Sequence, residues 1–184
     1  MRKVSEKDFG KYIRWARDNT ANNVYPCSIA EGIQSGDIYV NDDVETVFFW
    51  HYCGFGYISG KPSDEFLNDI YLRMISNHNE RRLILITSDD EVTDFFRDKE
   101  VLLDSRLEYS YLSHKFIGET HEDYRGKGLA AVLSDRMCEH ILEVGKKPVW
   151  AHSSSNLGSM KTALKCGFVQ DKINTVIRKN DSGG

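Results

Sequence analysis

The segment Tyr124-Arg125-Gly126-Lys127-Gly128-Leu129-Ala130 lies between a predicted strand at residues 115–120 and a predicted helix at residues 127–144. Two glycines two positions apart let the backbone turn sharply and approach a ligand closely. The N–H groups at the start of the following helix have no partner within the helix, and the helix dipole adds about half a positive charge there. Arg125 and Lys127 add full positive charges. Together these features predict a binding site for a pyrophosphate group.

Two other interpretations of this glycine segment stay open. The run from Gly126 to Ala131 also fits the looser pattern GxGxxA of dinucleotide-binding folds. Such a fold expects an acidic residue at the end of the next strand, about 20 residues further on. Here the next predicted strand ends at Trp150-Ala151-His152, which is not acidic. The remaining interpretation is a helix start with two turn glycines that binds nothing.

The glycine segment also resembles the acyl-CoA loop of the GNAT superfamily of N-acetyltransferases. That loop is written R/Q-x-x-G-x-G/A, and the matching residues are Arg125, Gly128 and Ala130. A second GNAT feature follows at the right distance, because Asn156 and Ser159, with Gly167-Phe168 behind them, resemble an N-x-x-A/S-(x)7-G-F helix.

The resemblance is closest to the zwittermicin-resistance-like branch of the superfamily. In that branch a Thr-x-x-x-Tyr-Arg-Gly-Lys-Gly-Leu-Ala stretch precedes a Pro-x-Trp strand. The matching residues here are Thr120, the run from Tyr124 to Ala130, and Pro148-Val149-Trp150.

This resemblance implies an acetyl-CoA-dependent N-acyltransferase that transfers an acetyl group to a small-molecule amine by direct attack in a ternary complex. The pantetheine arm would lie in a wedge between splayed parallel strands at residues 115–120 and 148–152. Acceptor sites in the superfamily are built from loops, expected here around residues 20–36 and 53–64. The implied cofactor-binding residues are Thr120, Arg125, Gly126, Lys127, Gly128, Leu129, Ala130, Asn156 and Ser159.

Catalysis would also require a proton to leave the ammonium group of the acceptor and a proton to reach the CoA thiolate. Many GNAT enzymes carry a tyrosine acid seven residues after the helix asparagine, and Ala163 occupies that position here. The candidates for proton transfer are therefore Glu119, His152 and Ser154. Each has a simpler interpretation, as an outward-facing strand carboxylate, a structural histidine and a serine that caps the next helix.

Periodicity predicts a mixed α/β fold, with a GNAT-like central twisted mixed sheet flanked by helices. Capping boxes at Ser5-Glu6-Lys7-Asp8 and Ser88-Asp89-Asp90-Glu91 predict helix starts. Leu129, Leu133, Met137 and Ile141 recur along an apolar face of the best-punctuated helix, which Gly145 ends. The predicted helices are residues 5–19, one opening at Pro62-Ser63, one after Ser88, 127–144, and one capped by Ser155 or Asn156. The predicted strands are residues 37–41, 44–52, 83–86, 107–112, 115–120, 148–151 and 168–177.

One order of elements fits the chain twice, at residues 44–112 and at residues 113–178. We therefore predict an N-terminal α/β part at residues 1–112, which would be a degenerate GNAT-like half on the substrate side. An acyl-CoA-binding half at 113–180 and a flexible tail at 181–184 follow. A complete GNAT domain has three strands ahead of the loop strand, so the N-terminal half or a partner subunit in a homodimer would have to supply them. If neither does, the chain is a non-catalytic CoA-binding or regulatory module of the same fold.

Composition narrows the classes of partner. The chain has 184 residues, 40% of them hydrophobic, and a formal net charge of −4, which gives no general attraction to nucleic acid or anionic membranes. No apolar run long enough to span a membrane and no signal peptide is evident, so a cytoplasmic protein is expected. The four cysteines form no closely spaced pair, which predicts free thiols and no metal site: Cys27, Cys53, Cys138 and Cys166.

Overall fold

The computed structural model describes residues 1–76, 81–112 and 129–180, and the helices and strands below refer to these ranges. Contacts divide the chain into two compact units, each described by itself. Unit 1 comprises Met1–Asp104 and Asn174–Gly184, and unit 2 comprises Ser105–Ile173. The chain therefore leaves unit 1 within one strand and returns to it within another.

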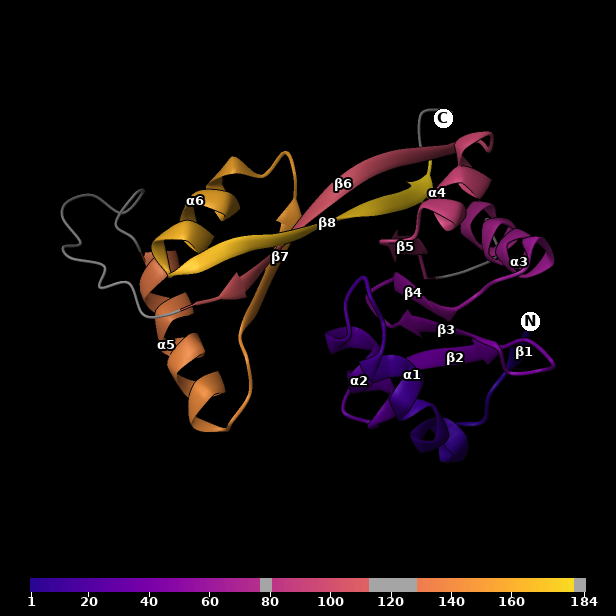
Figure 1. Cartoon of the computed structure of the whole chain (residues 1–184), viewed down its shortest axis with the longest axis horizontal. Helices are drawn as coiled ribbons and strands as arrows, with labels where there is room; N and C mark the ends of the chain where they lie inside the picture. The colour runs from indigo at the N-terminus through magenta and orange to yellow at the C-terminus, as the bar shows by residue number, and fades with distance from the viewer. Residues whose placement is uncertain (77–80, 113–128, 181–184) are drawn as a thin grey trace. The chain divides into compact units, whose positions relative to one another are not determined.

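Figure 1 labels the elements in chain order. Up to residue 112 they are β1 (Arg2–Lys3), the 3-10 helix η1 (Glu6–Tyr12), α1 (Ile13–Arg17), α2 (Val24–Ala30), β2 (Gly36–Val40), β3 (Thr46–His51), β4 (Phe55–Gly60), α3 (Asp64–Ile75), β5 (Ile84–Thr87), α4 (Asp90–Arg97) and β6 (Val101–Tyr111). From residue 129 they are α5 (Leu129–Glu143), β7 (Val149–Ser153), α6 (Leu157–Lys165) and β8 (Phe168–Lys179). The described strands follow the order β1-β2-β3-β4-β5-β8-β6-β7, with parallel and antiparallel pairs. The predicted mixed α/β fold is confirmed.

In unit 1, residues of β2 and β3 face two separate cores, as the alternation of side chains along a strand requires. Ile38 and Phe49 pack in a cluster with residues of η1, α1 and α2. Tyr39 and Phe48 pack in another cluster with residues of α3 and α4. All of these side chains are buried, so the unit 1 sheet is covered on both faces.

The order helix, strand, helix, strand occurs twice among the described elements, as α3–β5–α4–β6 and as α5–β7–α6–β8. In unit 1, β4 and β5 are parallel over a short stretch that includes Phe55↔Ile84, and β5 pairs antiparallel with the end of β8 through Thr87↔Thr175. In unit 2, β7 pairs antiparallel with β6 through Arg106↔Ser153. The inner strand of each series is thus paired with the last strand of the other.

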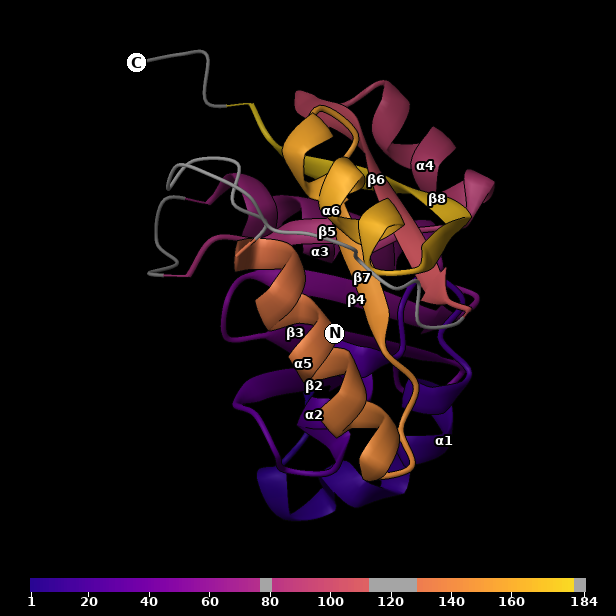
Figure 2. The same cartoon turned by 90° about the vertical axis from the view of Figure 1, so that its left-hand side faces the viewer.

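The core of unit 2 lies where α5 and α6 pack against its strands (Figure 2). The buried α5 residues are Ala131 and Cys138, and the carbonyl oxygen of Ala131 accepts a bond from the Cys166 thiol at 3.5 Å. Leu133 is 70% exposed and Met137 is 59% exposed. The predicted apolar face of this helix is therefore wrong at these two positions, because short side chains make the close contact with α6.

Helix ends show which capping predictions are right. Ser63 caps α3, and Gly145 has φ +71° after α5, as predicted. The side chain of Ser5 makes no cap bond, and the predicted helix at residues 5–19 is a 3-10 helix followed by a short α-helix. Before α4 the cap is Asp89 rather than Ser88, because its carboxylate accepts from the N–H groups of Glu91 and Val92.

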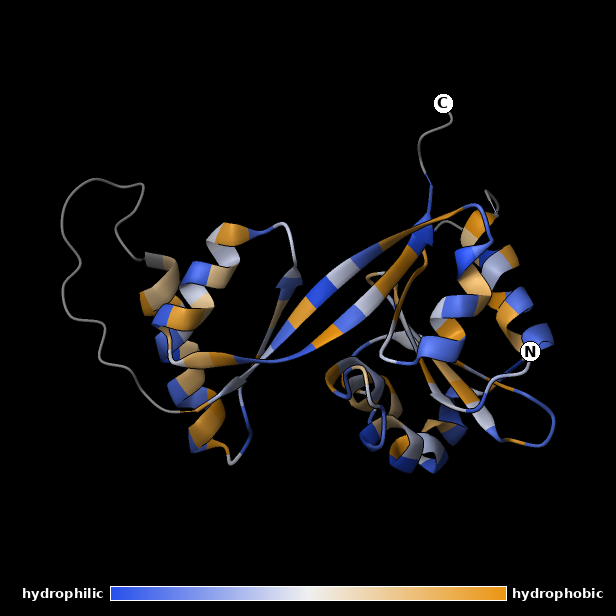
Figure 3. Cartoon of the chain, turned by 45° about the horizontal axis from the view of Figure 1, so that its top comes forward, coloured by the Kyte–Doolittle hydropathy of each residue, from blue (hydrophilic) through white to orange (hydrophobic). Residues whose placement is uncertain are grey.

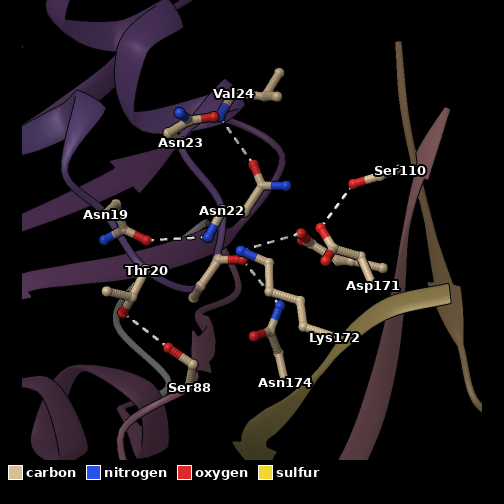
Figure 4. Close-up of polar contacts among 12 residues, drawn as sticks. Asn19, Thr20, Asn22, Asn23, Val24, Ser88, Ser110, Asp171, Lys172 and Asn174 are labelled. Atoms are coloured by element: carbon tan, nitrogen blue, oxygen red, sulfur yellow. Dashed lines mark hydrogen bonds and ion pairs between the residues drawn. The ribbon is translucent and has the colours of Figure 1, made fainter. Parts of the chain in front are cut away.

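Amide side chains hold the turn between α1 and α2 in unit 1 (Figure 4). Asn19 donates to the carbonyl oxygen of Ile58 at 2.8 Å and accepts from the N–H of Asn22 at 3.1 Å. Asn174 of β8, which is 0% exposed, donates to the carbonyl oxygen of Ala21 at 3.0 Å. The last strand of the chain therefore anchors a turn near its beginning.

Lowering the pH is expected to destabilise unit 1 through His51. Burial, with a smaller contribution from Arg81, lowers the pKa of His51 below its usual value of 6.5. Between the two pKa values the unfolded chain binds more protons than the folded chain, so the free energy of unfolding falls as the pH falls through 6.5, by up to about 1.4 kcal/mol per pH unit. Urea unfolding between pH 8 and pH 5 measures this slope. A slope that is the same in a His51→Gln variant would contradict it.

Candidate functional site

The site predicted from the sequence belongs to unit 2, around the starts of α5 and α6 and the end of β7. Leu129 is the first residue of α5, and Ala130 is exposed in its first turn. The residues His152, Ser154, Asn156 and Ser159 are also described. The remaining predicted site residues lie outside the described residues: Glu119, Thr120, Arg125, Gly126, Lys127 and Gly128.

The charges at the helix starts differ between the two parts of the chain. Neither α5 nor α6 has an acidic residue in its first turn. In contrast, α3 begins with Asp64 and Glu65, and α4 begins with Asp90 and Glu91. Carboxylates at a helix start repel an anion that the helix dipole would otherwise attract. The starts of α5 and α6 are therefore compatible with a pyrophosphate group, whereas those of α3 and α4 are not.

Asn156 begins α6 by a side-chain cap. Its Oδ1 accepts from the backbone N–H of Ser159 at 3.0 Å. The Oγ of Ser159 in turn accepts from the indole Nε1 of Trp150 at 2.9 Å, which ties the start of α6 to β7. Of the two caps predicted for this helix, Asn156 is the one observed. Both conserve the first turn of α6 in a fixed position beside β7.

His152 is the buried titratable residue of β7, with an exposed fraction of 4%. Its ring stacks on that of Tyr109 at 5.2 Å between centroids. Its Nδ1 lies 2.8 Å from the carbonyl oxygen of Ser153, which can only accept, so Nδ1 carries the hydrogen and Nε2 is the free lone pair of the neutral ring. Among the described residues, this buried Nε2 has no hydrogen-bond partner.

An unpaired buried polar atom costs about 1–3 kcal/mol, so the position of Nε2 calls for an explanation. A bound substrate atom or a water molecule would satisfy it. Chemically, a neutral imidazole held in this orientation can accept a proton at Nε2.

The structure places Ser154 directly after β7, where its backbone N–H donates to the carbonyl oxygen of Ser105 at 2.9 Å. The neighbouring hydroxyls of Ser153 and Ser155 bond to each other at 2.9 Å. The predicted residues His152 and Ser154 are thus brought to one end of β7, and that end is fixed by backbone bonds to β6.

Sequence reasoning missed one buried carboxylate, Glu108 of β6, which is 6% exposed. It pairs across the strands with Ala151, and Lys172 Nζ lies 3.7 Å from its Oε2. The pattern of polar and apolar residues along β6 and β8, visible in Figure 3, predicts a solvent-facing side chain at this position. The signal that could have found it is its place opposite the predicted strand that carries His152.

Other features of the described ranges are quickly stated. A cavity of about 430 Å³ lies in unit 1, lined among others by Phe9, Ile29, Glu31 and Gln34, and its size is that of a small-molecule pocket. Across the described residues, no group of three or more His, Cys, Asp or Glu side chains could hold a metal ion. No helix in the same ranges is long and apolar enough to cross a membrane.

Comparison with known proteins agrees with this geometry. Residues 113–177 match the GNAT acetyltransferase family. No curated protein matches the chain. A GCN5-related N-acetyltransferase-like protein from Streptococcus suis 89/1591 is similar in structure, with a TM-score of 0.63 and 15% identity over 96% of this chain and 100% of that one. An acetyltransferase of the GNAT family from Colwellia psychrerythraea has a TM-score of 0.52 and 10% identity over 97% of this chain and 99% of that one.

At these identities the two solved structures show the fold alone, and that fold is GNAT-like over nearly the whole chain. The sequence match is confined to the C-terminal part, where the acyl-CoA-binding half was predicted. The resemblance inferred from the sequence is thereby supported at the level of the GNAT acetyltransferase family. The zwittermicin-resistance-like branch stays a prediction.

Proposed function

We propose that this protein is a GNAT-type N-acetyltransferase that transfers an acetyl group from acetyl-CoA to a small-molecule amine. The observation that carries the proposal is the family match over residues 113–177, within which the described elements follow in the order α5, β7, α6 and β8. The absence of acidic residues from the first turns of α5 and α6 supports it, because these helix starts suit the CoA pyrophosphate.

In this proposal the C-terminal part of the chain binds acetyl-CoA. The main-chain amides of residues 126–130 hold the pyrophosphate, and Arg125 and Lys127 supply positive charge. Asn156 and Ser159 form the second part of the binding site, and their fixed first turn in α6 favours a preformed surface. Thr120 completes the predicted set.

The reaction in this proposal is a direct attack of the amine nitrogen on the thioester carbonyl carbon, with CoA leaving as the thiolate. His152 takes the proton of the acceptor ammonium at Nε2, the buried lone pair that has no partner among the described residues. Ser154 is the candidate donor of a proton to the thiolate. Glu119 is the alternative base. The proton removed from the amine and the one returned to CoA balance the overall transfer.

A second candidate function is a non-catalytic CoA-binding or regulatory module of the same fold. Its motive is Ala163, which stands where many GNAT enzymes carry a tyrosine acid. Ala163 is 0% exposed and packs in the unit 2 core with Cys138 and Phe168. A phenol has no room at this position, so the usual acid cannot be supplied from there.

A thermal-shift titration with acetyl-CoA, CoA and NAD tests the binding part of the proposal. At about 100 times its dissociation constant, acetyl-CoA should add about 2.7 kcal/mol to the free energy of unfolding, which raises the melting temperature by several degrees. A Gly128→Trp variant should lose this stabilisation because the indole would occupy the space needed by the pyrophosphate.

The outcomes separate the alternatives. Stabilisation by acetyl-CoA and CoA but not by NAD, lost in Gly128→Trp, supports the site. Stabilisation by NAD alone would favour the dinucleotide interpretation. No stabilisation by either CoA compound would remove the acetyltransferase proposal.

A further inference from the structure

A thiol, an imidazole and an amide form a hydrogen-bonded chain in unit 1, at the turn between β3 and β4. The Sγ of Cys53 lies 2.8 Å from Nδ1 of His51. On the other side of the ring, Nε2 of His51 lies 2.9 Å from Oε1 of Gln34. None of these residues belongs to the acetyl-CoA site proposed above.

The backbone decides which ring nitrogen carries the hydrogen. The N–H group of Cys53 points at Nδ1 of His51 at 3.3 Å, and because an N–H can only donate, Nδ1 is the acceptor. The hydrogen of the neutral ring is therefore on Nε2, where the Gln34 oxygen accepts it. In this tautomer Nδ1 is free to take the proton of the Cys53 thiol. A nucleophile, its base and a third group that orients the base are the arrangement that activates thiols in proteins.

The surroundings hold the imidazole in place. His51 is 1% exposed, and its ring contacts those of Tyr25 at 4.7 Å and Tyr52 at 4.5 Å between centroids. Burial lowers the pKa of His51, so the ring is neutral and able to accept a proton near pH 7. Cys53 itself is only half-buried, so a small reagent can reach it.

The turn that presents Cys53 is closed tightly. Gly54 has φ +100°, and a Cβ at this position would lie 2.7 Å from the carbonyl oxygen of Arg82. The Nε of Arg82 also donates to the carbonyl oxygen of Cys53 at 3.4 Å. The distance between the thiol and its base is therefore set by the backbone of the turn and by its contacts with Arg82.

The other three cysteines provide a contrast within the same molecule. Burial raises the pKa of Cys27 and of Cys166, and it raises that of Cys138 to about 11. At neutral pH these groups are thiols rather than thiolates, which are the reactive form. Cys27 is half-buried like Cys53 and belongs to the same unit, so it is a matched control.

We propose that Cys53 is a nucleophilic modification site that exchanges with small-molecule disulfides, with His51 as its base and Gln34 as the residue that positions the base. The thiol proton passes to Nδ1 of His51, and the thiolate attacks one sulfur of the disulfide. A new bond forms between Cys53 and that sulfur, the original S–S bond breaks, and the other half leaves as a thiolate that takes up the proton. Cys53 is oxidised, and the small disulfide is reduced by the same two electrons.

The test is the reaction of the native full chain with 4,4′-dithiodipyridine at pH 7, followed by thiopyridone release and located by peptide mass spectrometry. Cys53 is expected to react at least about tenfold faster than Cys27, because an adjacent base raises its thiolate fraction. Cys53→Ser should remove the fast phase, and Cys27→Ser should leave it intact.

Two variants test the positioning role of Gln34. Gln34→Leu removes the oxygen that accepts from His51 and should slow Cys53 by about tenfold, whereas Gln34→Glu keeps an acceptor and should restore the rate. In guanidinium chloride all variants should react alike, which separates positioning from intrinsic reactivity. Equal rates for Cys53 and Cys27 in the native protein, or a fast phase that survives Cys53→Ser, would overturn the proposal. An unchanged rate in Gln34→Leu would overturn the role of Gln34.

Discussion

A chain that ends at Ile173 is expected to lose the cooperative unfolding transition of unit 1. The deletion removes the part of β8 that pairs with β5 from Thr175 to Arg178. It also removes Ile177, which is 0% exposed in the core beside Leu85, and the side chain of Asn174. Loss of one buried isoleucine costs about 2–5 kcal/mol, and each lost hydrogen bond adds about 1 kcal/mol. The total exceeds much of the 5–15 kcal/mol typical of a domain.

A chain that ends at Asn180 is the matched control, because it keeps all of β8 and removes only the predicted tail at 181–184. Urea unfolding followed by circular dichroism measures both chains. The shorter chain should show no cooperative transition, and the control should unfold like the full chain. A cooperative transition of normal midpoint in the chain that ends at Ile173 would mean that β8 contributes little to unit 1.

His152→Asn is expected to reduce kcat by about 10²- to 10⁴-fold, the range that general base catalysis contributes. The asparagine amide can still donate to the carbonyl oxygen of Ser153, which preserves the local bond. It offers no nitrogen at the position of Nε2. The dissociation constant of acetyl-CoA should stay unchanged, so the loss is confined to the proton transfer. Release of the CoA thiol with a saturating amine measures kcat.

His140→Gln is the control for this variant, because His140 lies in α5 with its side chain 71% exposed and contacts only Glu143 at 3.8 Å among the ion pairs described. Its kcat should equal that of the parent chain. Full activity in His152→Asn would assign the proton to another group, with Glu119 as the next candidate.

Most of the regular structure follows from periodicity and capping in the sequence. Ser63, with acidic residues behind it, starts α3, and Gly145 ends α5 where a left-handed residue is needed. The alternating or continuous apolar runs of β3 and β5 were long enough to mark strands. These signals are local, so they survive in any tertiary context.

Two elements stand in segments that we expected to be loops, at residues 20–36 and 53–64. The seven-residue helix α2 contains Pro26 and has no side-chain cap, so its sequence carries no helix signal. The strand β4 contains Gly56, whose Cβ would lie 2.6 Å from the ring of Phe48, so close packing against the neighbouring strand requires a glycine there. Both elements are determined by tertiary contacts rather than by local preference.

The sequence predicted the candidate site more completely than its local environment. The neighbourhood of His152 and the cap formed by Asn156 agree with residues singled out by motif. The lone pair of His152 Nε2 and the burial of Glu108 depend on how β6 and β7 pair, and no local pattern encodes that pairing. For the same reason the contact between His51 and Cys53 could be recognised only in the folded turn.

The most direct test of the central claim is the release of CoA thiol from acetyl-CoA in the presence of a panel of small amines, with the parent chain and the Gly128→Trp variant side by side. The account predicts release that depends on at least one amine, exceeds the rate without amine, and is lost in the variant. Binding of acetyl-CoA without amine-dependent release would contradict the proposed enzyme and favour the non-catalytic module.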